Sequence, residues 1–178
     1  MSEHKLPTKA EALDILVAAG CSNRVIKHCN VVSDFSVRIA EAFRMRGIPV
    51  NVRLVEIGGL LHDVGRSRTH TVDHGLTGGK IARSLRLPNS VVRIIERHVG
   101  CGIPREEARR LRWPLRSYLP ETWEERIVCY ADKRTQGLRM LPIERALRTY
   151  VASLGQNHPA LDRIMKLHKE IVDVVGEL

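Results

Sequence analysis

A chain of 178 residues with 43% hydrophobic content is long enough to bury the core of one compact domain, which we expect to span residues 1–178. It holds no run of 18 apolar residues, and its N-terminus lacks the basic start and apolar stretch of a signal peptide. We therefore exclude a membrane-spanning or secreted protein and expect a cytoplasmic one. The net charge of +9 favours anionic partners such as nucleotides or nucleic acid, although an arginine-rich surface laced with salt bridges explains it equally well.

Glycines and prolines divide the chain into helical patterns, and no segment alternates convincingly as a β-strand does. The first helix is expected over residues 8–19, with Thr8 as its N-cap and Glu11 at the capping-box position. The second is expected over residues 22–46. Its apolar residues recur at spacings of three and four, which places His28 on the inward face.

The remaining patterns also predict helices. They cover residues 51–62, 74–85 and 88–98, a short basic helix within 104–120, and then residues 122–135, 142–154 and 159–175. The predicted fold class is therefore all-α, a single-domain bundle of eight or nine helices.

Six potential metal ligands stand at the ends or on the buried faces of these helices: His28, His62, Asp63, His74, His98 and Asp132. Any one of the histidines alone is more often a satisfied core residue, but a bundle could collect all six around a cation. Adjacent side chains on a helix diverge by about 100°, so His62 and Asp63 can meet one ion only where a helix ends. Mixed nitrogen and oxygen ligands suit Fe, Mn, Co, Ni or Zn more than Ca.

The order of these motifs resembles the HD-domain superfamily of metal-dependent phosphohydrolases. The motifs are His28, HDVG at 62–65, HGLTGG at 74–79, ERHVG at 96–100 and YADK at 130–133, together spanning residues 25–135. The chain is similar to the HDIG-type branch, with Val64 in place of isoleucine, and to small archaeal members. It departs from the HD-GYP type, and it lacks the acidic residue after the HD pair that mononuclear nucleotidase members use.

The resemblance implies an α-helical fold with a divalent metal centre, in which two ions are expected and the metal is Fe, Mn, Co, Ni, Zn or Mg. The motif positions assign His28, His62, Asp63 and Asp132 to the first ion, while His74 and His98 complete a second. Asp63 would bridge the ions and serve as the catalytic residue. Whether one ion or two bind stays open.

His70 and His74 are four residues apart, so the sequence leaves an ambiguity about the ligand. If residues 70–74 were helical, both side chains would share one face and could bind one ion together. The Gly-x-x-Gly-Gly context after His74 favours His74 as the ligand. His70 would then contact substrate or be a solvated loop residue.

Two bound cations would generate a nucleophilic water near neutral pH and neutralise phosphoryl oxygens. We therefore expect hydrolysis of a nucleotide or related phosphate ester, with Arg66, His70 and Lys133 as candidate substrate contacts and Arg68 and Arg134 as weaker ones. Each could equally be an ordinary solvated side chain.

An alternative function is a nucleotide-sensing or RNA-binding module that uses the same fold without turnover. It would use the basic segment at residues 105–116, with Trp113 available for stacking on a base. The competing interpretation is a solvated helix whose tryptophan packs on the core.

Overall fold

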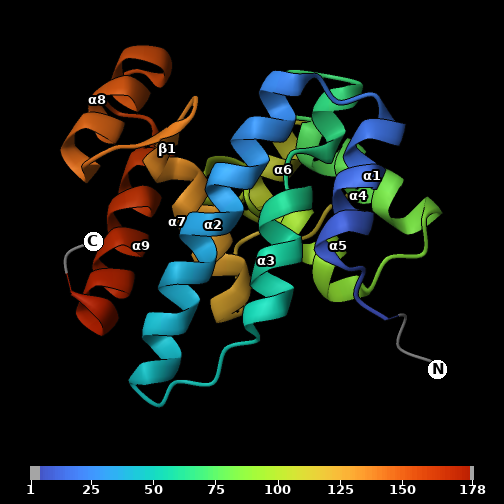
Figure 1. The fold of residues 1–178 in the computed structure, drawn as a ribbon. Coiled ribbons are helices and arrows are strands. Elements are labelled where there is room, and N and C mark those ends of the chain that lie inside the picture. The colour runs from blue at the N-terminus through green and yellow to red at the C-terminus, as the bar shows by residue number, and fades with distance from the viewer. Residues whose placement is uncertain (1–4, 177–178) are drawn as a thin grey trace.

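The computed structural model describes residues 5–176, which form nine α-helices and almost no other regular structure (Figure 1). The all-α fold expected from the sequence is confirmed. The helices are α1 Lys9–Ala19, α2 Asn23–Met45, α3 Val52–Leu61, α4 His74–Ser84, α5 Asn89–Arg97, α6 Arg105–Arg110, α7 Trp123–Arg134, α8 Ile143–Leu154 and α9 Pro159–Val175. Two 3-10 turns, η1 Val64–Ser67 and η2 Val99–Cys101, follow α3 and α5. None of the helices in the described range combines the length and apolarity needed to cross a membrane.

Local capping explains where the first helices begin. The predicted capping box of α1 is present, because the Thr8 hydroxyl accepts from the Glu11 N–H at 3.2 Å and the Glu11 carboxylate accepts from the Thr8 N–H at 2.6 Å. The Ser22 hydroxyl accepts from the Val25 N–H at the start of α2. These bonds satisfy backbone donors that have no partner within the helix.

A short antiparallel pair between α7 and α8 was not predicted. Strands β1 Thr135–Gln136 and β2 Arg139–Met140 pair around Gly137, whose φ is 62°. Two residues per strand are too few to produce the alternation by which a strand is recognised. The pair nevertheless matters for the site, because it brings the Gly137 carbonyl to His28.

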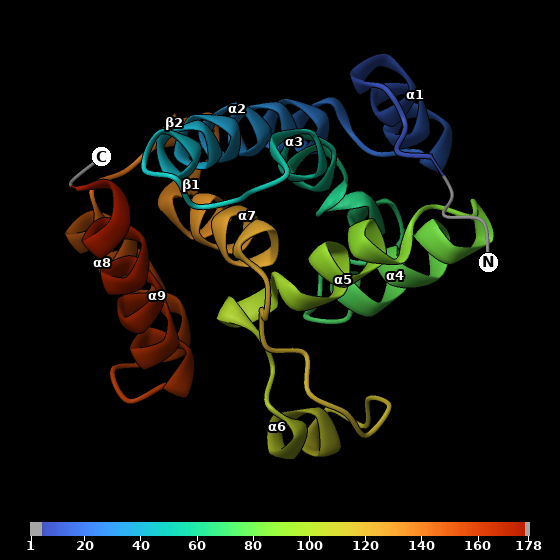
Figure 2. The same cartoon turned by 90° about the horizontal axis from the view of Figure 1, so that it is seen from below.

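Two apolar clusters organise the packing. One lies mainly among α2, α7 and α9, and the other joins α1, α2, α3 and α5 (Figures 1 and 2). Helix α3 packs closely along α2 at Gly59, where a Cβ atom would lie only 2.7 Å from the Ser33 Cα. This close approach carries His62, just beyond the end of α3, toward His28 on α2.

A third, smaller apolar cluster lies around α6, which stands apart from the main helices in Figure 2. Ile103, Ala108, Trp113 and Tyr118 form it, and Val72 and Leu76 pack against it. The cluster therefore connects the α6 segment to the turn that precedes α4.

Candidate metal centre

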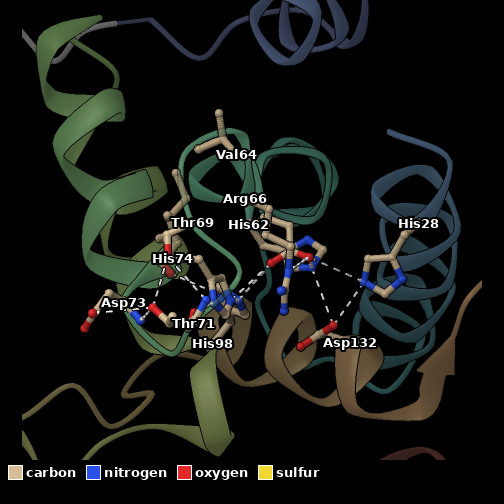
Figure 3. Close-up of polar contacts among 12 residues, drawn as sticks. His28, His62, Val64, Arg66, Thr69, Thr71, Asp73, His74, His98 and Asp132 are labelled. Atoms are coloured by element: carbon tan, nitrogen blue, oxygen red, sulfur yellow. Dashed lines mark hydrogen bonds and ion pairs between the residues drawn. The ribbon is translucent and has the colours of Figure 1, made fainter. Parts of the chain in front are cut away.

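Five helices bring the six candidate ligands to one place. Figure 3 shows His28, His62, His74, His98 and Asp132 pointing toward one another. His28 comes from α2, His62 and Asp63 directly follow α3, His74 begins α4, His98 follows α5, and Asp132 lies in α7. All six positions are buried or half-buried. Four of the six ligands lie at the ends of helices, where the backbone is free to turn their side chains inward.

Asp63 lies at the middle of the cluster. Its Oδ1 is 3.2 Å from Nε2 of His74 and 3.4 Å from Nε2 of His98. Its Oδ2 faces the other side, 3.7 Å from Nε2 of His62 and 3.9 Å from Nε2 of His28. The two oxygens of one carboxylate thus face two different sets of imidazoles.

Asp132 closes the side of the cluster nearer α2. Its Oδ1 lies 3.2 Å from Nε2 of His28 and 3.5 Å from Nε2 of His62, and its Oδ2 accepts from the Lys133 ammonium. The ligand atoms of His28, His62 and Asp132 all lie within 4.8 Å of one another, as do those of His62, Asp63 and His98. Either group could hold a metal ion.

Backbone carbonyls fix the orientation of three of the histidines. Nδ1 of His62, His74 and His98 each lies 2.7 Å from the carbonyl oxygen of the residue three positions earlier: Gly59, Thr71 and Ile95. A carbonyl only accepts, so Nδ1 carries the proton and Nε2 is left for the cluster. These carbonyl partners were not predicted from the sequence, in which the only indication of them is a histidine at a helix end.

The unsatisfied atoms of the cluster fit a cation. Nε2 of His62 and Oδ1 of Asp63 are buried and have no hydrogen-bond partner among the described residues. Nε2 of His74 and Nε2 of His98 lie 3.0 Å apart, and in neutral rings their lone pairs repel unless a cation or proton lies between them. Divalent metals that accept nitrogen and oxygen ligands would satisfy all four atoms.

The electrostatics of the cluster also suit a cation. Burial by itself would raise the pKa of Asp63, but His62, His74 and His98 outweigh it and hold that pKa well below its usual range. Lys133 and two histidines likewise hold the pKa of Asp132 well below its usual range against burial. Burial lowers the pKa of His98 to about 4, so this ring is neutral near pH 7, the form in which histidine binds metals.

A cavity of about 1040 Å³ opens onto the cluster. Its lining includes His28, Asp63, His74 and Asp132, and its far walls come from α6, α8 and α9, with Arg110, Tyr150, Leu154 and Arg163 among them. A cavity of this size accommodates a ligand larger than inorganic phosphate. The helical patterns of residues 142–154 and 159–175 did not predict that these helices would form one of its walls.

The three favoured substrate contacts all line this cavity. Arg66 is half-buried, and its Nε donates to Asp63 Oδ2 at 2.6 Å. Lys133 is buried beside Asp132, while His70 is exposed in the turn before α4. Because α4 begins only at His74, His70 and His74 do not share a helical face, and it is His74 whose Nε2 reaches Asp63.

Two weaker candidates for substrate contact lie away from the cavity, and the interpretation that Trp113 packs on the core is confirmed. Arg134 is buried and donates to the Leu141 carbonyl and the Tyr130 hydroxyl, and neither it nor Arg68 lines the cavity. Trp113 is only 6% exposed, and its Nε1 donates to Asp73 Oδ1. It is therefore not available to stack on a nucleic acid base.

Comparison with known proteins adds a family and several relatives. A family model described as "HD domain" matches residues 25–136. An uncharacterized protein from Methanocaldococcus jannaschii is 44% identical over 151 residues, which cover 85% of this chain and 89% of that protein. A tRNA (cytidine(56)-2'-O)-methyltransferase from Picrophilus torridus is 36% identical over 172 residues, covering 96% of this chain but only 48% of the methyltransferase.

Among solved structures, the chain is similar to the HD domain of the L. monocytogenes phosphodiesterase PgpH, determined in complex with cyclic-di-AMP. The TM-score is 0.55 at 14% sequence identity, and the match covers 94% of this chain and 98% of that one. At this identity the likeness concerns the fold.

Proposed function

The chain belongs to the HD-domain family, and from that premise we propose that it is a metal-dependent phosphohydrolase acting on a nucleotide or a related phosphate ester. The observation that carries this proposal is the position of the Asp63 carboxylate, whose two oxygens face separate sets of imidazole Nε2 atoms. Such an arrangement suits a carboxylate that bridges two cations.

The ligands divide between two sites in this proposal. His28, His62, Asp63 and Asp132 would hold the first cation, and Asp63, His74 and His98 would hold the second. The donor set of imidazole nitrogens and carboxylate oxygens fits Fe, Mn, Co, Ni or Zn better than Mg, which prefers oxygen ligands. Bound divalent cations supply a water that ionises near neutral pH and positive charge for the phosphoryl oxygens.

The protein groups around the centre would orient the substrate. Arg66 uses its Nε for Asp63, which leaves its terminal N–H groups for a phosphoryl oxygen at the cavity wall. The Lys133 ammonium balances the charge of Asp132, and His70 offers an exposed ring at the cavity edge. Asp63 would serve catalysis by holding the cations that bind the attacking water, because its depressed pKa keeps the carboxylate ionised.

A nucleotide substrate is supported by the size of the cavity and by its arginines. Arg24, Arg110 and Arg163 line it beyond the cluster, and Arg163 is paired with Glu107. The solved neighbour of the same fold was determined in complex with cyclic-di-AMP, which also supports a nucleotide substrate.

The direct test is hydrolysis by purified protein supplied with Mn²⁺ or Co²⁺ and a panel of nucleotides, dinucleotides and a generic phosphodiester. We expect turnover of at least one compound, lost in Asp63→Ala and retained in Asp34→Ala, because Asp34 is 70% exposed on α2. Failure to hydrolyse any compound faster than Asp63→Ala would remove the proposal.

A second candidate function is action on, or binding to, tRNA. The methyltransferase relative named above favours it, because this chain matches about half of that protein. The exposed arginines of the α6 segment, Arg105, Arg109, Arg110 and Arg112, offer contacts for phosphates. RNA binding that weakens steeply with salt and survives Asp63→Ala would favour this function, whereas no measurable RNA binding at low salt would exclude it.

A further inference from the structure

The turn that carries His74 is irregular. The Nδ1 acceptors of His62 and His98 are carbonyls inside α3 and α5, whereas the acceptor of His74 is Thr71, which precedes α4 and is exposed. Backbone bonds of a regular helix therefore hold two of the acceptors, whereas the Thr71 carbonyl accepts only a turn bond from the backbone, donated by the His74 N–H at 3.2 Å. The orientation of the His74 ring depends on what holds this turn.

Hydrogen bonds between the side chain of Thr71 and Asp73 hold the turn. The Thr71 hydroxyl donates to Asp73 Oδ2 at 3.4 Å and accepts from the Asp73 N–H at 3.3 Å, while the Thr71 carbonyl accepts from His74 Nδ1 (Figure 3). Asp73 occupies the N-cap position of α4, where an aspartate usually bonds the helix N–H groups, yet its side chain makes no capping bond. Its carboxylate serves another purpose.

That purpose is a contact with Trp113, 40 positions away in the chain. The Trp113 Nε1–H donates to Asp73 Oδ1 at 2.7 Å. The indole is buried, stands edge-on to Tyr118 with ring centroids 5.2 Å apart, and belongs to the α6 cluster on which Val72 and Leu76 pack. A rigid, buried group thus anchors an exposed turn on both its polar and its apolar side.

We propose that Trp113 is a positioning residue for His74. Its indole N–H fixes Asp73, Asp73 and Thr71 fix the turn, and the Thr71 carbonyl then sets the His74 ring toward Asp63 and His98. The affinity of the second cation, but not of the first, depends on this relay. The inference rests on the proposed function in one respect, that His74 helps to hold a second cation.

The test is calorimetric titration of metal-free protein with Mn²⁺, and with Co²⁺ while its visible absorption is recorded. Trp113→Phe keeps an aromatic ring in the cluster and removes only the N–H donor. Loss of a group that orients a metal ligand typically weakens binding by about 10- to 100-fold. We expect a loss of this size for one of two cations, the same one that His74→Ala loses, with the other cation unchanged.

Two controls separate positioning from packing. Tyr118→Phe removes the 3.2 Å hydrogen bond to the Pro114 carbonyl from the same cluster and should leave both affinities unchanged. Should Trp113→Phe fold poorly, Asp73→Ala removes the same hydrogen bond from the side of the exposed turn. It should weaken binding of the second cation and leave binding of the first unchanged. Asp73→Asn keeps a carbonyl oxygen as acceptor and should restore most of the affinity.

The outcomes are distinguishable from those of the proposed function. If wild-type protein binds two cations and Trp113→Phe and Asp73→Ala bind both as tightly, the relay is wrong while the two-cation centre stands. An equal loss of affinity for both cations in both variants also contradicts the relay, because the substitutions would then disturb the whole centre and not His74 in particular. If the wild type binds fewer than two cations, the two-cation centre fails and the relay fails with it.

Discussion

Asp63 and His98 show how burial and charge act together on single residues of the centre. Asp63 stays ionised although it is buried, since three histidines surround it, whereas His98 is held neutral by the same burial. The sequence identified both residues from their place in the motif. It could not identify the carbonyls of Gly59, Thr71 and Ile95 that orient the rings, because every residue carries a carbonyl and only the folded geometry selects three of them.

His98 makes the stability of the metal-free protein depend on pH. Its folded pKa is about 4, against about 6.5 when unfolded, so between these values only the unfolded state binds the proton. The contribution of His98 to stability should therefore fall as pH drops from 6.5 to 4, by up to about 1.4 kcal/mol per pH unit. Below about pH 5 the loss continues through Asp63 and Asp132, whose folded pKa values are depressed. Burial would lower the pKa of His62, but Asp63 and Cys29 outweigh it and raise that pKa, so the stability that His62 contributes is present below about pH 6.5 and is lost as pH rises above it.

Urea unfolding of chelator-treated protein across this range measures the effect. His98→Gln removes the titrating ring and should flatten the slope. An equal slope in wild type and His98→Gln would show that other groups cause the dependence.

Arg66 should act on the substrate, and Arg68 two residues later should not. Arg66 lines the cavity and Arg68 does not. A hydrogen bond to a charged group contributes about 1.5 to 3 kcal/mol, so Arg66→Ala should lower kcat/KM by about 10- to 100-fold. Steady-state kinetics on any compound hydrolysed in the panel measures this, with Arg68→Ala as the matched control. Equal losses in the two variants would mean that general surface charge, not a phosphoryl contact, is responsible.

The helix bounds could be predicted because capping residues and glycines mark where helices begin and end. The sequence predicted a start near His74 or Gly75, and α4 begins at His74, so residues 70–73 lie outside the helix. The β1–β2 pair was missed because it is too short to leave a pattern. The contact between Trp113 and Asp73 was missed because no periodicity connects residues 40 positions apart.

Gly65 is the glycine at which an added Cβ atom would meet the closest neighbour. A Cβ atom there would lie 1.9 Å from the His74 carbonyl oxygen, so η1 and α4 can only pack as they do with glycine at this position. Gly65→Ala should separate Asp63 from His74, weaken metal binding and cost about 1 to 3 kcal/mol of stability, as overpacking does. Thermal unfolding with and without metal measures both effects, and Lys80→Ala on the exposed face of α4 is the control. A Gly65→Ala protein with unchanged metal affinity would refute the argument.

At the scale of the molecule, the centre lies where helices from distant parts of the chain meet, and the cavity above it is completed by α6, α8 and α9. The six metal ligands could be predicted from the sequence because each lies in a recognisable motif at a helix end or on a buried face. The walls of the cavity could not, because Tyr150, Leu154 and Arg163 lie on amphipathic helices whose patterns indicate packing and nothing about what they face.

We propose that Asp63 bridges two cations, and the number of metal ions bound per chain tests this most directly. Protein purified without chelators and loaded with Mn²⁺ or Co²⁺ is analysed for bound metal per chain after removal of the free ion. We expect two ions per wild-type chain and a loss of both in Asp63→Ala, while Asp34→Ala keeps two. One ion or none in the wild type, or an Asp63→Ala protein that still binds two, would contradict it.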